Sequence, residues 1–112
     1  MTSDHRLMGS DGFVVAAKVS DVPVGGIKFV EVQGVPVALC RVGDRFFAVG
    51  NVCTHDAGPL SGGTLEDHVI ECPRHGAKFD VRDGRGLCLP APLPIPTYEV
   101  RVEGEQIKVK AA

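Results

Sequence analysis

Two short cysteine–histidine motifs constrain this chain more than any other feature of its sequence. The first is Cys53-Thr54-His55, the second is Cys72-Pro73-Arg74-His75, and sixteen residues separate them. Together they offer two thiolates and two imidazoles, which can fill a tetrahedral zinc site or hold a [2Fe–2S] cluster with two histidines on one iron. The chain is therefore expected either to fold around a structural metal ion or to transfer electrons through a cluster.

The grouping of these ligands helps to distinguish the two kinds of site. Structural zinc sites usually group like ligands, in Cys-x₂₋₄-Cys and His-x₃₋₅-His spacing. Here each motif contributes one cysteine and one histidine. Cys53 and Cys72 can then bind one iron, while His55 and His75 bind the other. The mixed grouping favours a cluster and leaves a zinc-stabilised structural module as an alternative.

Composition and patterning favour a single all-β domain. The 112 residues are 44% hydrophobic, and 14 glycines with 8 prolines favour turns over helices. Apolar and polar residues alternate in several segments, as in strands with one buried face. We predict strands at Phe13–Lys18, Ile27–Val32, Val35–Val42, Arg45–Val49, Val69–Glu71, Ala77–Asp80 and Tyr98–Glu103, and a last strand that contains Ile107 and Val109. Gln33-Gly34 is expected to form a tight turn that needs positive φ.

The metal motifs lie in a segment that interrupts this pattern. Residues 51–83 are rich in Gly, Pro, His and Cys, and strand patterns flank them. We therefore predict an antiparallel β-sandwich with a small inserted cluster-binding lobe. The proline-rich residues 89–96 follow the lobe and cannot form a central strand, because proline lacks an N–H donor. Residues 1–12 are interpreted as a flexible leader and residues 13–112 as one domain.

Charge and hydropathy exclude several classes of partner and compartment. The formal net charge is −2 and no basic patch is visible, so nucleic acid is not an expected partner. No apolar run could span a bilayer and no signal peptide is visible, so we expect no membrane association and a cytoplasmic location. In that compartment metal binding explains the cysteines better than disulfides do. No catalytic or nucleotide-binding motif is visible, so we do not expect an enzyme.

The segments Cys53–Leu60 and Cys72–Asp80 resemble the Rieske [2Fe–2S] signature. The strand pattern extends this resemblance over roughly Phe13–Lys110. The chain is similar to the small soluble ferredoxins that serve bacterial aromatic-ring-hydroxylating, non-haem iron oxygenases. The resemblance implies a Rieske-like antiparallel β-sandwich that carries one [2Fe–2S] cluster and transfers single electrons.

The same resemblance assigns the ligands. It places Cys53 and Cys72 on the inner iron, and His55 and His75 on the outer, solvent-facing iron. The proline-rich residues 89–96 resemble the family's proline loop, which covers the cluster. The implied partners are an NAD(P)H-dependent flavoprotein reductase and a terminal oxygenase, which dock transiently near His55 and His75. A carrier for another redox or iron–sulfur assembly system is the alternative.

Four positions depart from the high-potential respiratory branch of the family. That branch has a disulfide between its cluster loops, where this chain has Gly58 and Arg74. It also has a serine and a tyrosine where this chain has Ala77 and Phe79. Because hydroxyl donors to the cluster raise its reduction potential, we expect a low potential, about −150 mV.

The remaining cysteines and histidines have simpler interpretations. Cys40 lies in an apolar segment, and Cys88 precedes the proline-rich stretch. We expect both to be buried, unreactive thiols rather than ligands. His5 and His68 have no neighbouring cysteine and are expected at the surface.

Overall fold

The structure is a computed structural model of the chain. It describes residues 12–53, 58–60, 62–73, 76–88 and 93–111, apart from the side chain of Cys88. In these ranges no helix has the length and apolar character needed to cross a membrane. Residues 1–11 of the predicted leader, both candidate histidine ligands and residues 89–92 lie outside the described residues.

Strands form nearly all of the regular structure. They are β1 (Val14–Lys18), β2 (Ile27–Val32), β3 (Val35–Val42), β4 (Arg45–Gly50), β5 (Thr64–Glu66), β6 (Val69–Glu71), β7 (Lys78–Asp80), β8 (Gly86–Cys88), β9 (Thr97–Glu103) and β10 (Gln106–Lys110). The 3₁₀ helix η1 (Val19–Asp21) follows β1. The predicted strands are confirmed, whereas β5, β8 and η1 were not predicted.

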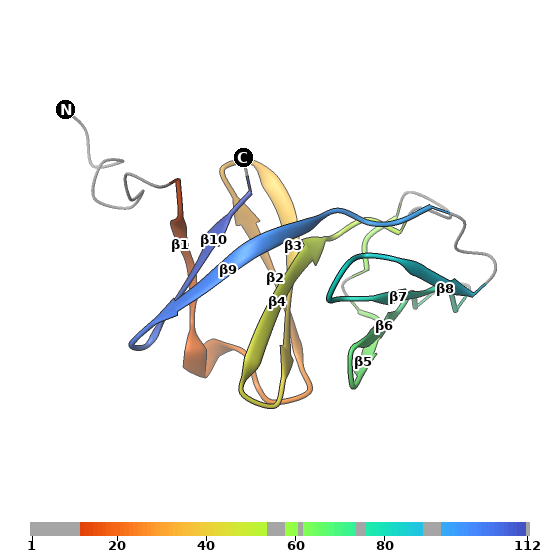
Figure 1. The fold of residues 1–112 in the computed structure, drawn as a ribbon, viewed down its shortest axis with the longest axis horizontal. Helices are drawn as coiled ribbons and strands as arrows, with labels where there is room; N and C mark the ends of the chain where they lie inside the picture. The colour runs from red at the N-terminus through yellow and green to blue at the C-terminus, as the bar shows by residue number, and fades with distance from the viewer. Residues whose placement is uncertain (1–11, 54–57, 61, 74–75, 89–92, 112) are drawn as a thin grey trace.

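These strands form two antiparallel sheets. The larger sheet has the order β1-β10-β9-β4-β3-β2, and the smaller has the order β5-β6-β7-β8. The two edge strands of the larger sheet approach each other, so this sheet curls around a core. Figure 1 shows the smaller sheet beside the β3–β4 side of the larger one. The predicted all-β, antiparallel fold class is confirmed.

The β2–β3 hairpin confirms the predicted tight turn. Val32 pairs with Val35, which leaves Gln33 and Gly34 as a two-residue loop. Both loop residues have positive φ, 52° and 84°. Two-residue loops of this kind match the right-handed twist of the flanking strands, so this turn fixes the register of the hairpin.

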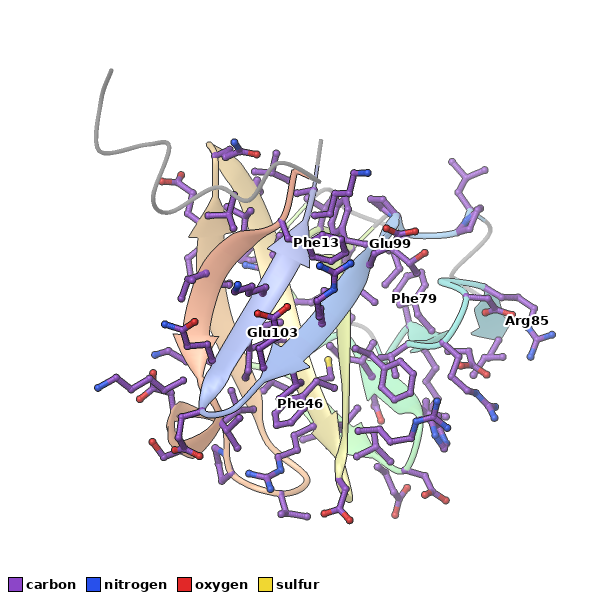
Figure 2. All side chains as sticks on the ribbon, turned by 60° about the vertical axis from the view of Figure 1, so that its left-hand side comes forward. Phe13, Phe46, Phe79, Arg85, Glu99 and Glu103 are labelled. Atoms are coloured by element: carbon purple, nitrogen blue, oxygen red, sulfur yellow. The ribbon has the colours of Figure 1, made fainter. Side chains whose placement is uncertain are left out.

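Two hydrophobic cores lie on opposite faces of β3 and β4. The first fills the curled sheet and contains Ala17, Val22, Val32, Val37, Leu39, Ala48, Ile107 and Val109. The second lies between the two sheets and contains Ala38, Cys40, Val49, Cys53, Leu60, Ile70, Cys72, Ala77, Phe79, Val81 and Ile95. Figure 2 shows Phe79 at the boundary of the two sheets.

This double burial explains why β3 is apolar along most of its length. Alternate side chains of a strand point to opposite faces. Val37 and Leu39 therefore enter the first core, while Ala38 and Cys40 enter the second. β4 alternates in the same way, with Ala48 in the first core and Val49 in the second. The β3–β4 hairpin thus lies between the two cores and contributes side chains to both.

Candidate metal centre

Two loops with matching backbone closure carry the two candidate cysteine ligands. The N–H of Cys53 donates to the carbonyl of Gly58 over 2.7 Å, and the N–H of Cys72 donates to the carbonyl of Ala77 over 2.7 Å. In both loops the bond joins a cysteine to the residue five positions later. The two cysteines therefore occupy equivalent positions at the start of equivalent loops.

Both cysteines are buried in the second core. Cys53 is 0% exposed and Cys72 is 1% exposed. Both are thiols rather than half of a disulfide. The structure thus brings Cys53 and Cys72 into one apolar cluster, although they lie far apart in the sequence. Apolar surroundings keep water away from a bound metal group and influence its reduction potential.

Asn51 supports the first loop and was not predicted from the sequence. Its side chain is buried, and its Oδ1 accepts a hydrogen bond of 2.8 Å from the N–H of Leu60. Its own N–H donates to the carbonyl of Pro36 over 3.1 Å. Asn51 therefore joins the two ends of the first loop and attaches them to the start of β3. A polar residue directly after the apolar β4 was the available signal.

Glycines shape the second loop and the segment after the first. Gly76 has φ of 73°, and its N–H donates to the carbonyl of Cys72 over 3.2 Å. A methyl group on Gly63 would overlap with the carbonyl oxygen of Glu71. Gly63 therefore lets the chain after the first loop lie directly against the residue that precedes Cys72.

A cavity of about 450 Å³ opens where these segments meet. It is lined by Gly62, Gly63, Thr64, Glu71, Cys72, Pro73 and Gly76. Cys72 therefore has an open space beside it despite its low exposure. The matched loops suit a metal group that is held between two cysteines, and the cavity reaches the second of these cysteines.

The structure does not bring together a complete ligand set. His55 and His75 lie outside the described residues. In the ranges that the structure does describe, no three His, Cys, Asp or Glu side chains gather as a metal site. The assignment of the two histidines as ligands therefore stays a prediction.

Ala77 and Phe79 provide apolar surroundings close to Cys72. Both side chains are fully buried in the second core, and neither carries a hydroxyl group. Gly58, where the respiratory branch has a cysteine, closes the first loop through its carbonyl. Arg74, at the other matching position, lies outside the described residues.

Backbone hydrogen bonds attach the end of the proline-rich stretch to both parts of the molecule. Ile95 is buried in the second core, and its N–H donates to the carbonyl of Gly84 over 2.9 Å. The carbonyl of Pro96 accepts a hydrogen bond from Gly50 at the end of β4 over 2.9 Å. This segment is therefore anchored to the smaller sheet and to the larger one.

A buried carboxylate organises the turn between β7 and β8. Asp80 is 3% exposed and accepts hydrogen bonds from Nη2 of Arg82 at 2.8 Å, from its Nε at 3.0 Å and from its backbone N–H at 2.9 Å. Nη2 of Arg85 lies 3.6 Å from the same carboxylate. The hydrogen bonds of Arg82, which outweigh the opposing effect of burial, lower the pKa of Asp80 to about 2.

The other cysteines and histidines are only partly as expected. Cys40 is buried in β3, as predicted, and burial raises the pKa of its thiol to about 12. The backbone of Cys88 lies in β8. His68 was expected at the surface, but it is half-buried and its ring packs edge-on against Phe47, with ring centroids 5.5 Å apart. This prediction was wrong because the smaller sheet places His68 against β4.

Comparison with known proteins identifies a family for this arrangement. The family model of the Rieske [2Fe–2S] domain matches residues 12–99. The ferredoxin component of the naphthalene 1,2-dioxygenase/salicylate 5-hydroxylase systems of Ralstonia sp is 39% identical over 101 residues, which cover 90% of this chain and 97% of the relative.

Solved structures agree with this relationship. The ferredoxin of carbazole 1,9a-dioxygenase from Nocardioides aromaticivorans IC177 superposes with a TM-score of 0.86 at 34% identity, over 89% of this chain and 98% of that one. A structure described as a complex of reduced oxygenase and oxidised ferredoxin in carbazole 1,9a-dioxygenase gives 0.82 at 38% identity, over 88% and 93%. These relatives are electron-transfer components rather than catalytic subunits. The chain belongs to the Rieske [2Fe–2S] family.

Proposed function

We propose that this protein is the ferredoxin component of a bacterial oxygenase system. It carries single electrons from an NAD(P)H-dependent flavoprotein reductase to a non-haem iron oxygenase in the cytoplasm. The single observation that carries this proposal is the pair of matched loops that bury Cys53 and Cys72 in one core. The similarity of nearly the whole chain to oxygenase ferredoxins supports it further.

We also propose the ligand set and the domain organisation. Cys53 and Cys72 would bind the inner iron, and His55 and His75 the outer one. When bound, the cluster accepts one electron and releases it again. Residues 13–112 would form a single domain, with a cluster-binding lobe at about 51–83 and a covering loop at about 89–96.

The chain's own residues favour a low reduction potential. Ala77 and Phe79 occupy buried positions near Cys72 without offering a hydroxyl donor. Fewer hydrogen bonds to the cluster and its thiolates leave the added electron less stabilised. We therefore expect a potential near the lower end of the Rieske range, about −150 mV.

We propose that both partners dock transiently near His55 and His75. The related ferredoxin of carbazole 1,9a-dioxygenase has been described in complex with its oxygenase, which supports an oxygenase as one partner. An electron carrier has to release each partner after transfer. A small interface, below about 1,200 Å², suits such an encounter.

Spectroscopy followed by reconstitution tests the proposal. The purified protein should be coloured, and its reduced form should give the EPR signal of a cluster with two histidine ligands. Cys53→Ser, Cys72→Ser, His55→Ala and His75→Ala should each lose this signal, while Cys40→Ser should keep it. Reductase with NAD(P)H should reduce the protein, and oxygenase should reoxidise it. A colourless protein with stoichiometric zinc would refute the proposal in favour of a structural zinc module.

A further inference from the structure

Glu71 is a half-buried acid directly beside the second candidate cluster loop. It is the last residue of β6 and immediately precedes Cys72. Its carboxylate approaches Gly76, because a methyl group on Gly76 would lie 3.3 Å from Oε2 of Glu71. Glu71 also lines the cavity of about 450 Å³ beside Cys72. The carboxylate therefore lies against the loop that carries the second pair of proposed ligands.

The described residues do not neutralise this charge. The ion pairs that they form involve Asp80, Asp83 and Glu103 as acids, and Glu71 is not among them. Lys78 is directly opposite Glu71 in the β6–β7 register, yet its ammonium group does not reach the carboxylate within ion-pair distance. Thr64, which is opposite Glu71 on β5, carries no charge.

Asp80, in the same small sheet, is a structural carboxylate and differs from Glu71 in its partners. Two arginines and one backbone N–H satisfy Asp80. Glu71 lacks such compensation in the described part of the chain, although Lys78 is nearby. Its negative charge therefore acts on any group bound in the cavity and on the adjacent second cysteine loop.

We propose that Glu71 lowers the reduction potential of the cluster. This inference rests on the proposed function, because it presumes a cluster at Cys72 and His75. Reduction adds one electron to the cluster, and the fixed negative charge of Glu71 raises the free energy of that added electron. By Coulomb's law this effect grows as the effective dielectric constant falls, so it is larger for the half-buried Glu71 than for a fully exposed carboxylate.

Replacing Glu71 by glutamine tests this directly. Glu71→Gln keeps the size and shape of the side chain and removes its charge. In a spectroelectrochemical titration of the isolated holoprotein, the equilibrium constant for reduction should rise about tenfold, which is about 59 mV for a one-electron couple. Salt should reduce this difference, since it screens exposed charges.

Three further variants separate charge from other effects. Glu71→Asp keeps the charge and should stay within about twofold of the wild-type equilibrium. Glu66→Gln makes the same charge change at an exposed position of β5 outside the cavity, so its effect should also be below about twofold. Lys78→Gln removes a nearby positive charge and should shift the equilibrium in the opposite direction.

The outcomes distinguish this inference from the proposed function. A colourless wild-type protein would contradict the proposed function itself. A coloured wild type with the expected EPR signal, together with a Glu71→Gln potential no different from that of Glu66→Gln, would overturn only the role of Glu71. Because the potential is measured without reductase or oxygenase, an effect that appears only in turnover with a partner would show that Glu71 serves docking instead.

Discussion

The carboxylate of Asp80 should stabilise the fold of the smaller sheet measurably. In the folded protein its pKa lies near 2 instead of its ordinary 3.8, mainly because Arg82 donates hydrogen bonds to it. One pKa unit corresponds to about 1.4 kcal/mol, and salt screens the exposed arginines, so we expect Asp80→Asn to cost about 2 kcal/mol at pH 7.

The pH dependence of this loss has a defined sign. Since folding lowers the pKa of Asp80, its stabilisation is fully present above about pH 4 and is lost as the pH falls towards 2. The difference between the wild type and Asp80→Asn should therefore be constant from pH 7 to pH 5. By pH 3 it should fall to about half.

Urea unfolding followed by far-UV circular dichroism measures both quantities. Urea is preferable to guanidinium because it adds no salt that would screen the ion pairs. With a slope of about 1–2 kcal/mol per M, the midpoint should fall by about 1–2 M at pH 7. Asp83→Asn is the matched control, because Asp83 is 56% exposed and lies 4.0 Å from Arg85. An equal loss in both variants, or a difference that is unchanged at pH 3, would refute the reasoning.

Two further predictions concern single positions in the second core and its loops. Gly63→Ala should destabilise the holoprotein by about 1–3 kcal/mol in the same urea assay, because the added methyl group overlaps with the carbonyl of Glu71. Thr64→Ala, at an exposed position, is its control, and an unchanged unfolding midpoint of Gly63→Ala would contradict the prediction. Cys40 should resist iodoacetamide at pH 8 in the native protein and react in urea, because burial raises the pKa of its thiol to about 12; alkylation of native Cys40 at the rate of an exposed thiol, measured by mass spectrometry, would disagree with this.

Local patterns in the sequence were sufficient to predict most strands of the larger sheet. β9 and β10 alternate regularly, and the Gln33-Gly34 turn needs only the conformations of its own two residues. β5 and β8 were missed because Gly62 and Gly63 directly precede β5 and Gly86 begins β8, and glycine is typical of turns rather than of strands. β5 pairs with β6 and β8 pairs with β7, so both strands depend on hydrogen bonds to neighbouring strands. These pairings come from the tertiary fold and not from the local sequence.

The candidate ligands were predictable because each cysteine lies close to a histidine in the sequence. The cysteine–histidine spacing pointed to Cys53 and Cys72, which the structure brings into one core. The supports of the site depend on long-range contacts. Asn51 reaches Leu60 across a whole loop, and His68 meets Phe47 only because the smaller sheet packs on β4. The only local signal of the first contact is a polar residue directly after an apolar strand, and the second contact leaves no local pattern.

The burial of both faces of the β3–β4 hairpin limits how this protein can be engineered. A minimal electron-transfer peptide cut from residues 51–88 would keep both cysteine loops and the whole smaller sheet. It would lose Ala38, Cys40 and Val49, which form one side of the second core, and Ile95, which follows the cut. Transplanting the site into another scaffold therefore requires a host that supplies an equivalent hairpin with apolar residues on both faces.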